Sequence, residues 1–535
     1  MIVVRTTLAR PYGLRALCVL CLLAVLPACD MSETAAPSAN GPAASSTSGS
    51  AAPADAIRGS AVAVGQPEEM WDLNFMQGQR VGYEQTTVQE LEEGGKKLVE
   101  VRTLSRLGVK RSGSLVTLEA RSTSIETPTG ELVRFQTEMK FPPTTTVTTG
   151  RIEGNQIVIQ LESDGKTETT RLPWTPDIKG FFGVERSLKS APMKPGEERK
   201  LKIMWPMLNS TSEVLLTARD VEPTDLPGGS RKLLRVDTVS TFSNGQVIDT
   251  TIWTDEAGNR WKTHSDAMQA ETFRTTKEVA LDPKADVKLD LVYDTTVRLD
   301  QPLPHPYDLK RARYRVELAG SDPAKVFPTF LNQRVIPGDT RSAELIITAA
   351  RLQDVGMVGA ADPAPAPGSP ELSASSLVQI DDRGVLAMAT AGRGNSTDPV
   401  EVALSLEQYV HGVISKKNFT QAFASAAEVA RSREGDCSEH AVLLVALARA
   451  CGIPARGAVG LLYVDSIHGF GYHMWTEVYV RDRWAPLDAM LGRGGIGPAH
   501  IKLGHTDLQG SSAYSDFLPV VQVSGRLKIQ VLEAE

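Results

Sequence analysis

Cysteine is scarce in this 535-residue chain and unevenly placed. Of its five cysteines, Cys18, Cys21 and Cys29 lie near the N-terminus, which leaves Cys437 and Cys451 for the rest. The segment between these two lacks Gly and Pro and is expected to be one helix, so the 14 steps separate their Cα atoms by roughly 21 Å. A disulfide needs about 4.4–6.8 Å. We therefore expect two free thiols.

Long hydrophobic runs and long basic runs are also missing. No segment reaches 18 consecutive apolar residues, so none should cross a bilayer as a permanent helix. The net charge of −7 argues against nucleic acid as the main partner. Gly-x-Ser-x-Gly, P-loop and His-Glu-x-x-His patterns are absent. We expect no cofactor and no metal.

The N-terminus has the features of an export signal. Basic residues at positions 5, 10 and 15 precede an apolar core over residues 16–26, which at 11 residues is too short to span a membrane. The sequence LPAC that follows resembles the lipobox of bacterial lipoproteins. This resemblance implies that residues 1–28 are removed and that Cys29 is lipidated. An ordinary signal peptide that happens to contain a cysteine is the alternative.

The resemblance also bears on location. A lipidated Cys29 would anchor the protein to a membrane of the cell envelope, facing the periplasm or the exterior. Asp30 resembles the residue that keeps lipoproteins at the inner membrane in some bacteria.

Composition divides the mature chain into five segments. Residues 29–65 are rich in Ala, Ser, Pro and Gly and are predicted to form a disordered tether. Alternating apolar and polar residues with turn pairs predict an antiparallel β region over 66–298 and a small β module over 299–355. A Pro-rich linker over 356–373 leads to helical and then strand-like patterns over 374–535. The expected fold is an α+β catalytic domain preceded by large all-β antiparallel domains.

Two segments of the β region, 126–139 and 254–268, are loosely alike at a few positions. A duplicated β unit and chance explain this likeness equally well.

Cys437 is expected in the first turn of a helix that begins after Gly435 and Asp436 and ends at Gly452. Unpaired backbone N–H groups and the positive end of the helix dipole favour an anion there. A cysteine at such a position can have a lowered pKa and act as a nucleophile, although a buried structural cysteine is an equal alternative from position alone. Cys451, at the opposite pole, is predicted to be structural.

A thiolate catalyst needs a base and a group that orients the base. If Arg481 and Asp482 form a two-residue hairpin loop, then His473 and Asp488 lie on one face of the sheet as diagonal neighbours. A three-residue loop would place them on opposite faces. The predicted pairing therefore depends on the parity of the loop.

Three motifs in order, GDCSEHAVLLVALARACGIPAR, HMWTEVYV and RWAPLD, resemble the transglutaminase-like superfamily, which has a papain-like Cys-His-Asp triad. The resemblance covers roughly residues 400–505. It implies Cys437 as the nucleophile, His473 as the base and Asp488 as the orienting residue.

A zinc site is a weaker alternative, with Cys437 and His440 joined by His468 or His473. No second ligand pair accompanies them, so we expect His440 to be a residue at the edge of the core and His468 to lie in a loop. Glu477 is expected to have a structural role in its strand.

Two functions fit these residues. One is a cell-envelope cysteine enzyme that acts on amide bonds of peptides or proteins through a thioester, with water (protease, amidase or deamidase action) or an amine (transglutamination) as the acceptor. The other is a non-catalytic binding or scaffold lipoprotein with a vestigial transglutaminase-like domain.

Overall fold

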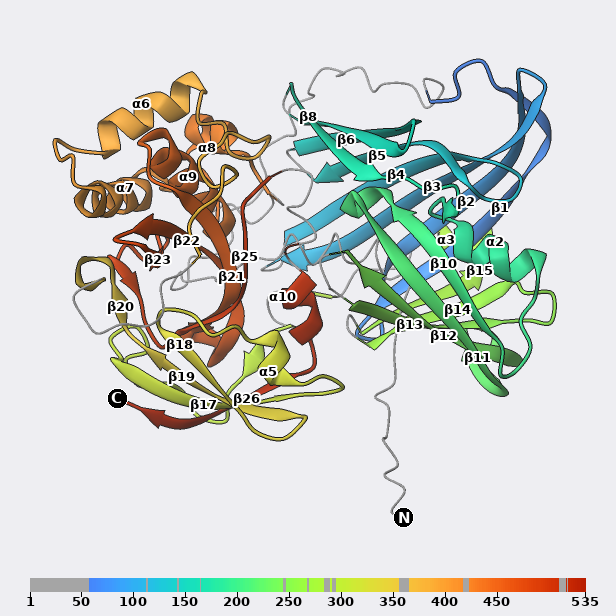
Figure 1. Cartoon of the computed structure of the whole chain (residues 1–535). Coiled ribbons are helices and arrows are strands. Elements are labelled where there is room, and N and C mark those ends of the chain that lie inside the picture. The colour runs from blue at the N-terminus through green and yellow to red at the C-terminus, as the bar shows by residue number, and fades with distance from the viewer. Residues whose placement is uncertain are drawn as a thin grey trace, which may run out of the picture.

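The computed structural model describes residues 57–111, 114–141, 144–163, 165–243, 247–266, 269–282, 289–290, 295–355, 365–416, 423–509, 516 and 518–535. An antiparallel β region is followed by an α+β part beside it (Figure 1). This arrangement confirms the predicted fold class. The expected signal peptide and Cys29 lie outside the described residues.

A single 15-stranded sheet makes up the β region. Its strands are β1 (Val62–Met76), β2 (Gln79–Glu93), β3 (Lys96–Arg111), β4 (Ser114–Glu126), β5 (Leu132–Phe141), β6 (Thr144–Glu153), β7 (Gln156–Ser163), β8 (Lys166–Pro173), β9 (Ile178–Lys179), β10 (Glu198–Trp205), β11 (Ser210–Leu226), β12 (Gly229–Phe242), β13 (Val247–Thr254), β14 (Arg260–Ser265) and β15 (Ala270–Thr275). The strands β1 to β8 and β10 to β15 form two meanders, joined where β1 pairs antiparallel with β15, and the short β9 pairs parallel with β10. A twisted sheet of this length usually curls, and Phe135 of β5 and Met204 of β10 accordingly belong to one small buried cluster.

The two segments that are alike in sequence form the same kind of hairpin turn. The backbone N–H of Thr127 donates to the carbonyl of Glu131 (2.9 Å), and that of Asp255 donates to Asn259 (3.0 Å). Helix α2 (Gly183–Ser190) lies against both turns, because a Cβ added at Gly130 would meet the Arg186 side chain and one at Gly258 would meet the Leu188 carbonyl. The likeness therefore reflects a shared local geometry.

The second part holds the predicted helices and a sheet in the order β16-β22-β21-β25, with β23 paired to β22. The strands are β16 (Val297–Arg298), β21 (Ala455–Val464), β22 (Gly469–Val480), β23 (Arg483–Leu487) and β25 (His500–Thr506), and the helices are α6 (Arg383–Gly392), α7 (Pro399–Val413), α8 (Ala426–Ser432) and α9 (Cys437–Ala450). The remaining short elements are α3 (Lys277–Ala280), α5 (Pro323–Val326), β20 (Ala350–Arg351) and β24 (Gly495–Ile496), and β20 pairs with β24. Helix α9 is buried along its whole length, as its apolar sequence predicts.

The small β module differs from the prediction. Its strands β17 (Arg311–Leu318), β18 (Gln333–Pro337) and β19 (Ser342–Thr348) are joined by β26 (Leu527–Ala534), in the order β18-β19-β17-β26. Residues 299–355 therefore do not form a separate module, and the catalytic segment 374–535 does not contain all of its own sheet. The apolar stretch before β26 is helix α10 (Leu518–Val523) and not a strand, because Pro519 cannot donate a ladder hydrogen bond but suits a first helical turn.

Two segment boundaries also shift. The predicted tether ends early, because Ile57 packs in a buried cluster with Leu91, Leu98 and Ile125, and β1 begins at Val62. Residues 29–56 lie outside the described residues.

The second shift concerns β16, which was assigned to the β region. It pairs with β22 of the α+β sheet, Val297 opposite Phe470. Of the Pro-rich linker, residues 365–373 are described, and the carbonyl of Ser373 accepts a hydrogen bond from Arg449 of α9 (2.9 Å).

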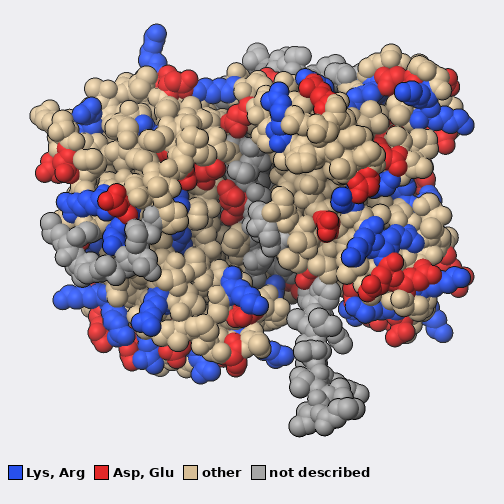
Figure 2. Space-filling view, viewed as in Figure 1, with Lys and Arg blue, Asp and Glu red and all other residues tan. Residues whose placement is uncertain are grey.

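The surface carries charges of both signs. On the face in Figure 2, Lys and Arg side chains alternate with Asp and Glu over both parts. Within the described ranges, no helix is long and apolar enough to cross a membrane.

Candidate active site

Cys437 is the first residue of α9, and a hydrogen-bonded cap holds that helix end. The Asp436 carboxylate accepts from the backbone N–H of Ser438 (3.0 Å), and the Glu439 carboxylate accepts from the N–H of Asp436 (2.9 Å). Gly435 makes room for this capping box, because a Cβ there would lie 2.2 Å from the Cβ of Glu439. The Cys437 side chain is 0% exposed and sits where backbone N–H groups favour an anion.

The hairpin of β22 and β23 has the predicted two-residue loop. Val480 pairs with Arg483, and the loop residues Arg481 and Asp482 both have positive φ, as a type I′ turn requires. The parity prediction is therefore confirmed. Nε2 of His473 lies 2.8 Å from Oδ2 of Asp488.

The direction of α9 brings Cys437 to the same end of the sheet as His473. A short turn links the C-terminus of α9 to Ala455, which pairs with Val478 near the far end of β22, so α9 and β22 run the same way. The Thr476 hydroxyl donates to the Ala441 carbonyl (3.2 Å) where they cross. The first turn of α9 therefore lies toward His473.

The electrostatics agree with this placement. Burial lowers the pKa of His440, one turn into α9, while the negative charge of Asp488 partly opposes that change. The first turn of α9 is thus within electrostatic reach of the His473–Asp488 pair.

Asp488 is held as an anion although its side chain is only 1% exposed. Burial alone would raise its pKa, but the charge of His473 and the hydrogen bonds from His473 and His500 outweigh burial and lower it. Its Oδ1 accepts from the backbone N–H of Met490 (2.9 Å). Because the Asp488 carboxylate accepts a hydrogen bond from Nε2 of His473, it fixes the orientation of the ring and leaves Nδ1 as the nitrogen for proton transfer.

Two buried residues of this site, His500 and Glu407, were not predicted from the sequence. Nε2 of His500, on β25, lies 3.0 Å from the same Oδ2 of Asp488. Glu407 of α7 accepts from the backbone N–H groups of Asp488 (3.2 Å) and Gly494 (2.8 Å), and burial raises its pKa to about 8. No motif marks either residue, because only the folded sheet and α7 bring them to Asp488.

The alternative zinc ligands are not brought together. Nδ1 of His440 lies 2.6 Å from the Asp436 carbonyl of its own helix turn. His468 is exposed on a left-handed turn, φ 47°, at the start of β22. Both placements agree with the minor roles expected for these histidines. A different group, His473, Asp488 and His500, has its potential ligand atoms within 4.8 Å of one another.

Cys451 and Glu477 have the predicted structural surroundings. Cys451 caps the C-terminus of α9 as a free thiol, and burial raises its pKa. Glu477 is fully buried and pairs with Arg456 (2.8 Å) and with Lys502. Burial opposes ionisation of Glu477, but the two cations outweigh it and lower the pKa.

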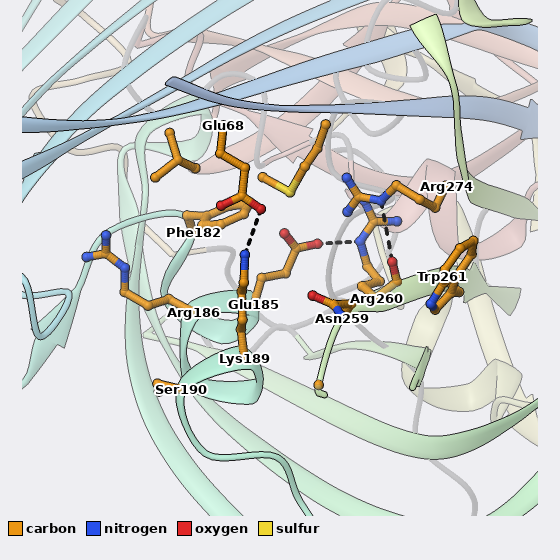
Figure 3. A pocket seen from close by; sticks show the side chains of 13 residues that line it. Glu68, Phe182, Glu185, Arg186, Lys189, Ser190, Asn259, Arg260, Trp261 and Arg274 are labelled. Atoms are coloured by element: carbon orange, nitrogen blue, oxygen red, sulfur yellow. Dashed lines mark hydrogen bonds and ion pairs between the residues drawn. The ribbon is translucent and has the colours of Figure 1, made fainter. Parts of the chain in front are cut away.

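A separate cavity of about 410 Å³ lies in the β region between α2 and the sheet. Figure 3 shows Glu185 directed at Arg260, with Phe182 and Trp261 on opposite sides. Arg260 also pairs with the buried Asp72 (2.5 Å). The residues that line this cavity include no cysteine or histidine, so it lacks a thiol–imidazole pair.

Comparisons with known proteins agree with the site. Residues 387–489 match the model of the transglutaminase-like superfamily. A search of curated proteins finds no match.

Solved structures show weaker likeness. A candidate cysteine protease from Cytophaga hutchinsonii is 15% identical (42% of this chain, 89% of that chain, TM-score 0.27). A β-barrel-like protein of a domain of unknown function from Brucella abortus is 11% identical (39% and 94%, TM-score 0.28). A candidate protease from Parabacteroides distasonis is 10% identical (68% and 68%, TM-score 0.19). Scores this low carry no conclusion about function. The motifs, the hairpin and the family match together identify residues 387–489 as a transglutaminase-like domain.

Proposed function

We propose that this protein is a cysteine acyl-transfer enzyme that acts on amide bonds of peptides or proteins. The observation that carries the proposal is the hydrogen bond between His473 and Asp488 at the end of the sheet toward which α9 directs Cys437. Cys437, His473 and Asp488 then act as nucleophile, base and orienting anion.

The proposed reaction uses only groups of this chain. The sulfur of Cys437 attacks the amide carbonyl carbon, and the thiol proton passes to Nδ1 of His473. The imidazolium gives that proton to the leaving amine as the C–N bond breaks, which leaves a thioester. Water or a second amine then attacks the thioester carbon and gives a proton to His473, the C–S bond breaks to release the acid or the new amide, and His473 returns that proton to the sulfur of Cys437. Water is the expected acceptor, because it is abundant at the cell surface.

Thiol labelling tests this proposal. Iodoacetamide at mildly acidic pH should modify Cys437 well before Cys451, as read by peptide mass mapping. His473→Ala should slow labelling of Cys437 strongly, while Cys451→Ser serves as the matched control and leaves it unchanged. Equal labelling of both thiols, or labelling that ignores His473, would contradict the assignment.

The complete burial of Cys437 favours one alternative, a binding or scaffold protein whose transglutaminase-like domain is inactive. That alternative predicts that Cys437 stays unlabelled until the protein unfolds. Release of ammonia from a glutamine-containing protein by the wild type, but not by Cys437→Ser, would exclude it.

We also propose that the protein is a lipoprotein of the cell envelope, anchored through Cys29. The lipobox-like sequence before Cys29 supports this proposal. Cys29→Ser should release the protein from the membrane fraction without changing its folding. Retention of the variant in that fraction would show that another anchor exists.

A further inference from the structure

Asp488 has a second histidine partner. His500 is the first residue of β25 and pairs with Leu462 of β21. Strand β21 lies between β25 and β22, the strand that carries His473. Its Nε2 lies 3.0 Å from Oδ2 of Asp488, the oxygen that also contacts His473 at 2.8 Å. The two imidazole centroids are 5.7 Å apart. One carboxylate oxygen is thus contacted by two imidazoles.

Packing fixes the His500 ring in this position. Its side chain is 2% exposed and meets the Trp475 ring edge-on, with centroids 5.5 Å apart. Gly460 allows Trp475 to pack there, since a Cβ at Gly460 would lie 2.8 Å from the indole. The ring cannot turn away without disturbing this aromatic cluster.

Hydrogen-bond chemistry fixes the proton on His500. The ionised Asp488 only accepts, so each imidazole must present an Nε2–H to Oδ2. Burial lowers the pKa of His500, which keeps that ring neutral with its single proton on Nε2. His500 is then a neutral donor of fixed direction, unlike His473, whose ring changes charge in the proposed reaction.

We propose that His500 is a positioning residue of the proposed reaction, a hydrogen-bond donor that holds Oδ2 of Asp488 in place and aimed at His473. The inference rests on the proposed function, because it assigns a purpose to the contact only if His473 is the base. The side chain of His500 contacts Asp488 and the rings of His473 and Trp475, so its proposed effect on the reaction passes through Asp488.

The other titratable groups around Asp488 do not supply this bond. Glu407 of α7 contacts the backbone N–H of Asp488, and His440 of α9 bonds its own helix turn. Within the described residues, the side-chain hydrogen bonds to the Asp488 carboxylate come from His473 and His500. Loss of the His500 donor should therefore loosen the Asp488 carboxylate and weaken its hold on the His473 ring.

Two substitutions distinguish the role of the Nε2–H donor of His500 from the role of its ring in packing. His500→Gln keeps an N–H near the position of Nε2 but removes the ring, whereas His500→Phe keeps the ring against Trp475 but removes the donor. His505→Gln, at an exposed position of the same strand, is the matched control. The readout on the full-length protein is the rate of Cys437 alkylation by iodoacetamide across pH 4–9, with thermal unfolding as the folding check.

We expect His500→Phe to slow alkylation about tenfold near neutral pH and to move the acid limb of the profile upward by roughly half to one pH unit. The limb moves upward because a less firmly held Asp488 stabilises the His473 imidazolium less, which raises the pH at which Cys437 becomes a thiolate. His500→Gln and His505→Gln should keep the profile of the wild type.

Several outcomes overturn the inference. A folded His500→Phe protein with the profile of the wild type would show that the contact has no role in positioning. Equal damage by Phe and Gln would show that packing, not the donor, matters. One bound zinc per wild-type chain, lost in His500→Gln, would make the cluster a metal site. If wild-type Cys437 is unreactive, or if its alkylation rate does not depend on His473, then the proposed function fails instead.

Discussion

The β region and the transglutaminase-like domain each bury a carboxylate between two cationic or potentially cationic side chains. In the β region Asp72 lies beside Arg260 (2.5 Å) and Arg274 (3.3 Å). In the transglutaminase-like domain, Asp488 lies beside His473 and His500. The geometry is similar, but an arginine keeps its proton at any physiological pH and an imidazole does not.

This difference separates a structural cluster from a chemical one. Burial opposes the charge of Arg260, but Asp72 and Glu185 outweigh burial and raise the pKa of Arg260, so this guanidinium keeps its charge. It ties α2 to the sheet. The Asp488 cluster can pass a proton through His473 to a thiol. Four experiments test this contrast.

Removal of the Asp488 charge should have the largest effect. Asp488→Asn should cut turnover by about 10³- to 10⁴-fold, because His473 loses the anion that fixes its tautomer. His473→Ala should abolish turnover. The double variant should cost little more than His473→Ala alone, since both residues serve one function. Additive losses in initial rates would show that they act independently.

Truncation should show that the smallest fragment of the α+β part that folds begins before residue 374, the boundary predicted from the sequence. Residues 295–535 keep β16 and β17–β19 and should fold and retain Cys437 labelling. Residues 374–535 leave β26 without β17 and β22 without β16, and should lose cooperative unfolding. Circular dichroism melts compare the two. Normal folding of the shorter fragment would contradict the importance of these pairings.

Arg260→Met should destabilise the β region by about 3–5 kcal/mol, because it removes the Arg260 cation from the buried Asp72 and the partly buried Glu185, and only Asp72 keeps a second arginine, Arg274. Cys437 labelling in the protein that remains folded should not change. Arg121→Met is the matched control: its side chain is 54% exposed and pairs with Glu119, so its loss should cost under about 1 kcal/mol. Denaturant unfolding followed by tryptophan fluorescence measures both. Similar costs would mean that the Arg260 cluster is not a structural centre.

The smallest effect is expected at His264 of β14. Hydrogen bonds to Asp266 and then Glu271 raise its pKa to about 9. A folded pKa above the unfolded one stabilises the protein fully below about pH 6.5, and the contribution disappears as pH rises through about 9. His264→Gln should therefore lower the free energy of unfolding by under about 1 kcal/mol at pH 6 and by almost nothing at pH 9.5. A difference independent of pH in urea titrations would refute the assignment.

Local chemistry made much of this structure predictable. The alternation of apolar and polar residues predicted the strands. The apolar sequence between Asp436 and Gly452, which lacks Gly and Pro, predicted the buried helix. The length of the loop between β22 and β23 decides which face of the sheet Asp488 shares, so the expected two-residue loop was enough to place Asp488 beside His473.

Non-local pairing was not predictable in the same way. The contact of β26 with β17 spans about two hundred residues, and no turn connects the two strands. His500 reaches Asp488 only because β25 pairs with β21. Ile57 follows a low-complexity stretch, so its composition suggested a tether although its side chain is buried.

The strand order β18-β19-β17-β26 makes the transglutaminase-like domain an insertion into another unit. The chain leaves this four-stranded sheet after β19 and returns in β26, and both strands flank β17. Both strands run antiparallel to β17, so they run parallel to each other. The segment leaves the sheet at Thr348, opposite Arg311, and returns at Leu527, opposite Leu318 at the other end of β17. The inserted segment therefore spans the length of β17, roughly 23 Å for seven residues. The four-stranded sheet can close only after the whole inserted segment, with Cys437, His473, Asp488 and His500, has been synthesised.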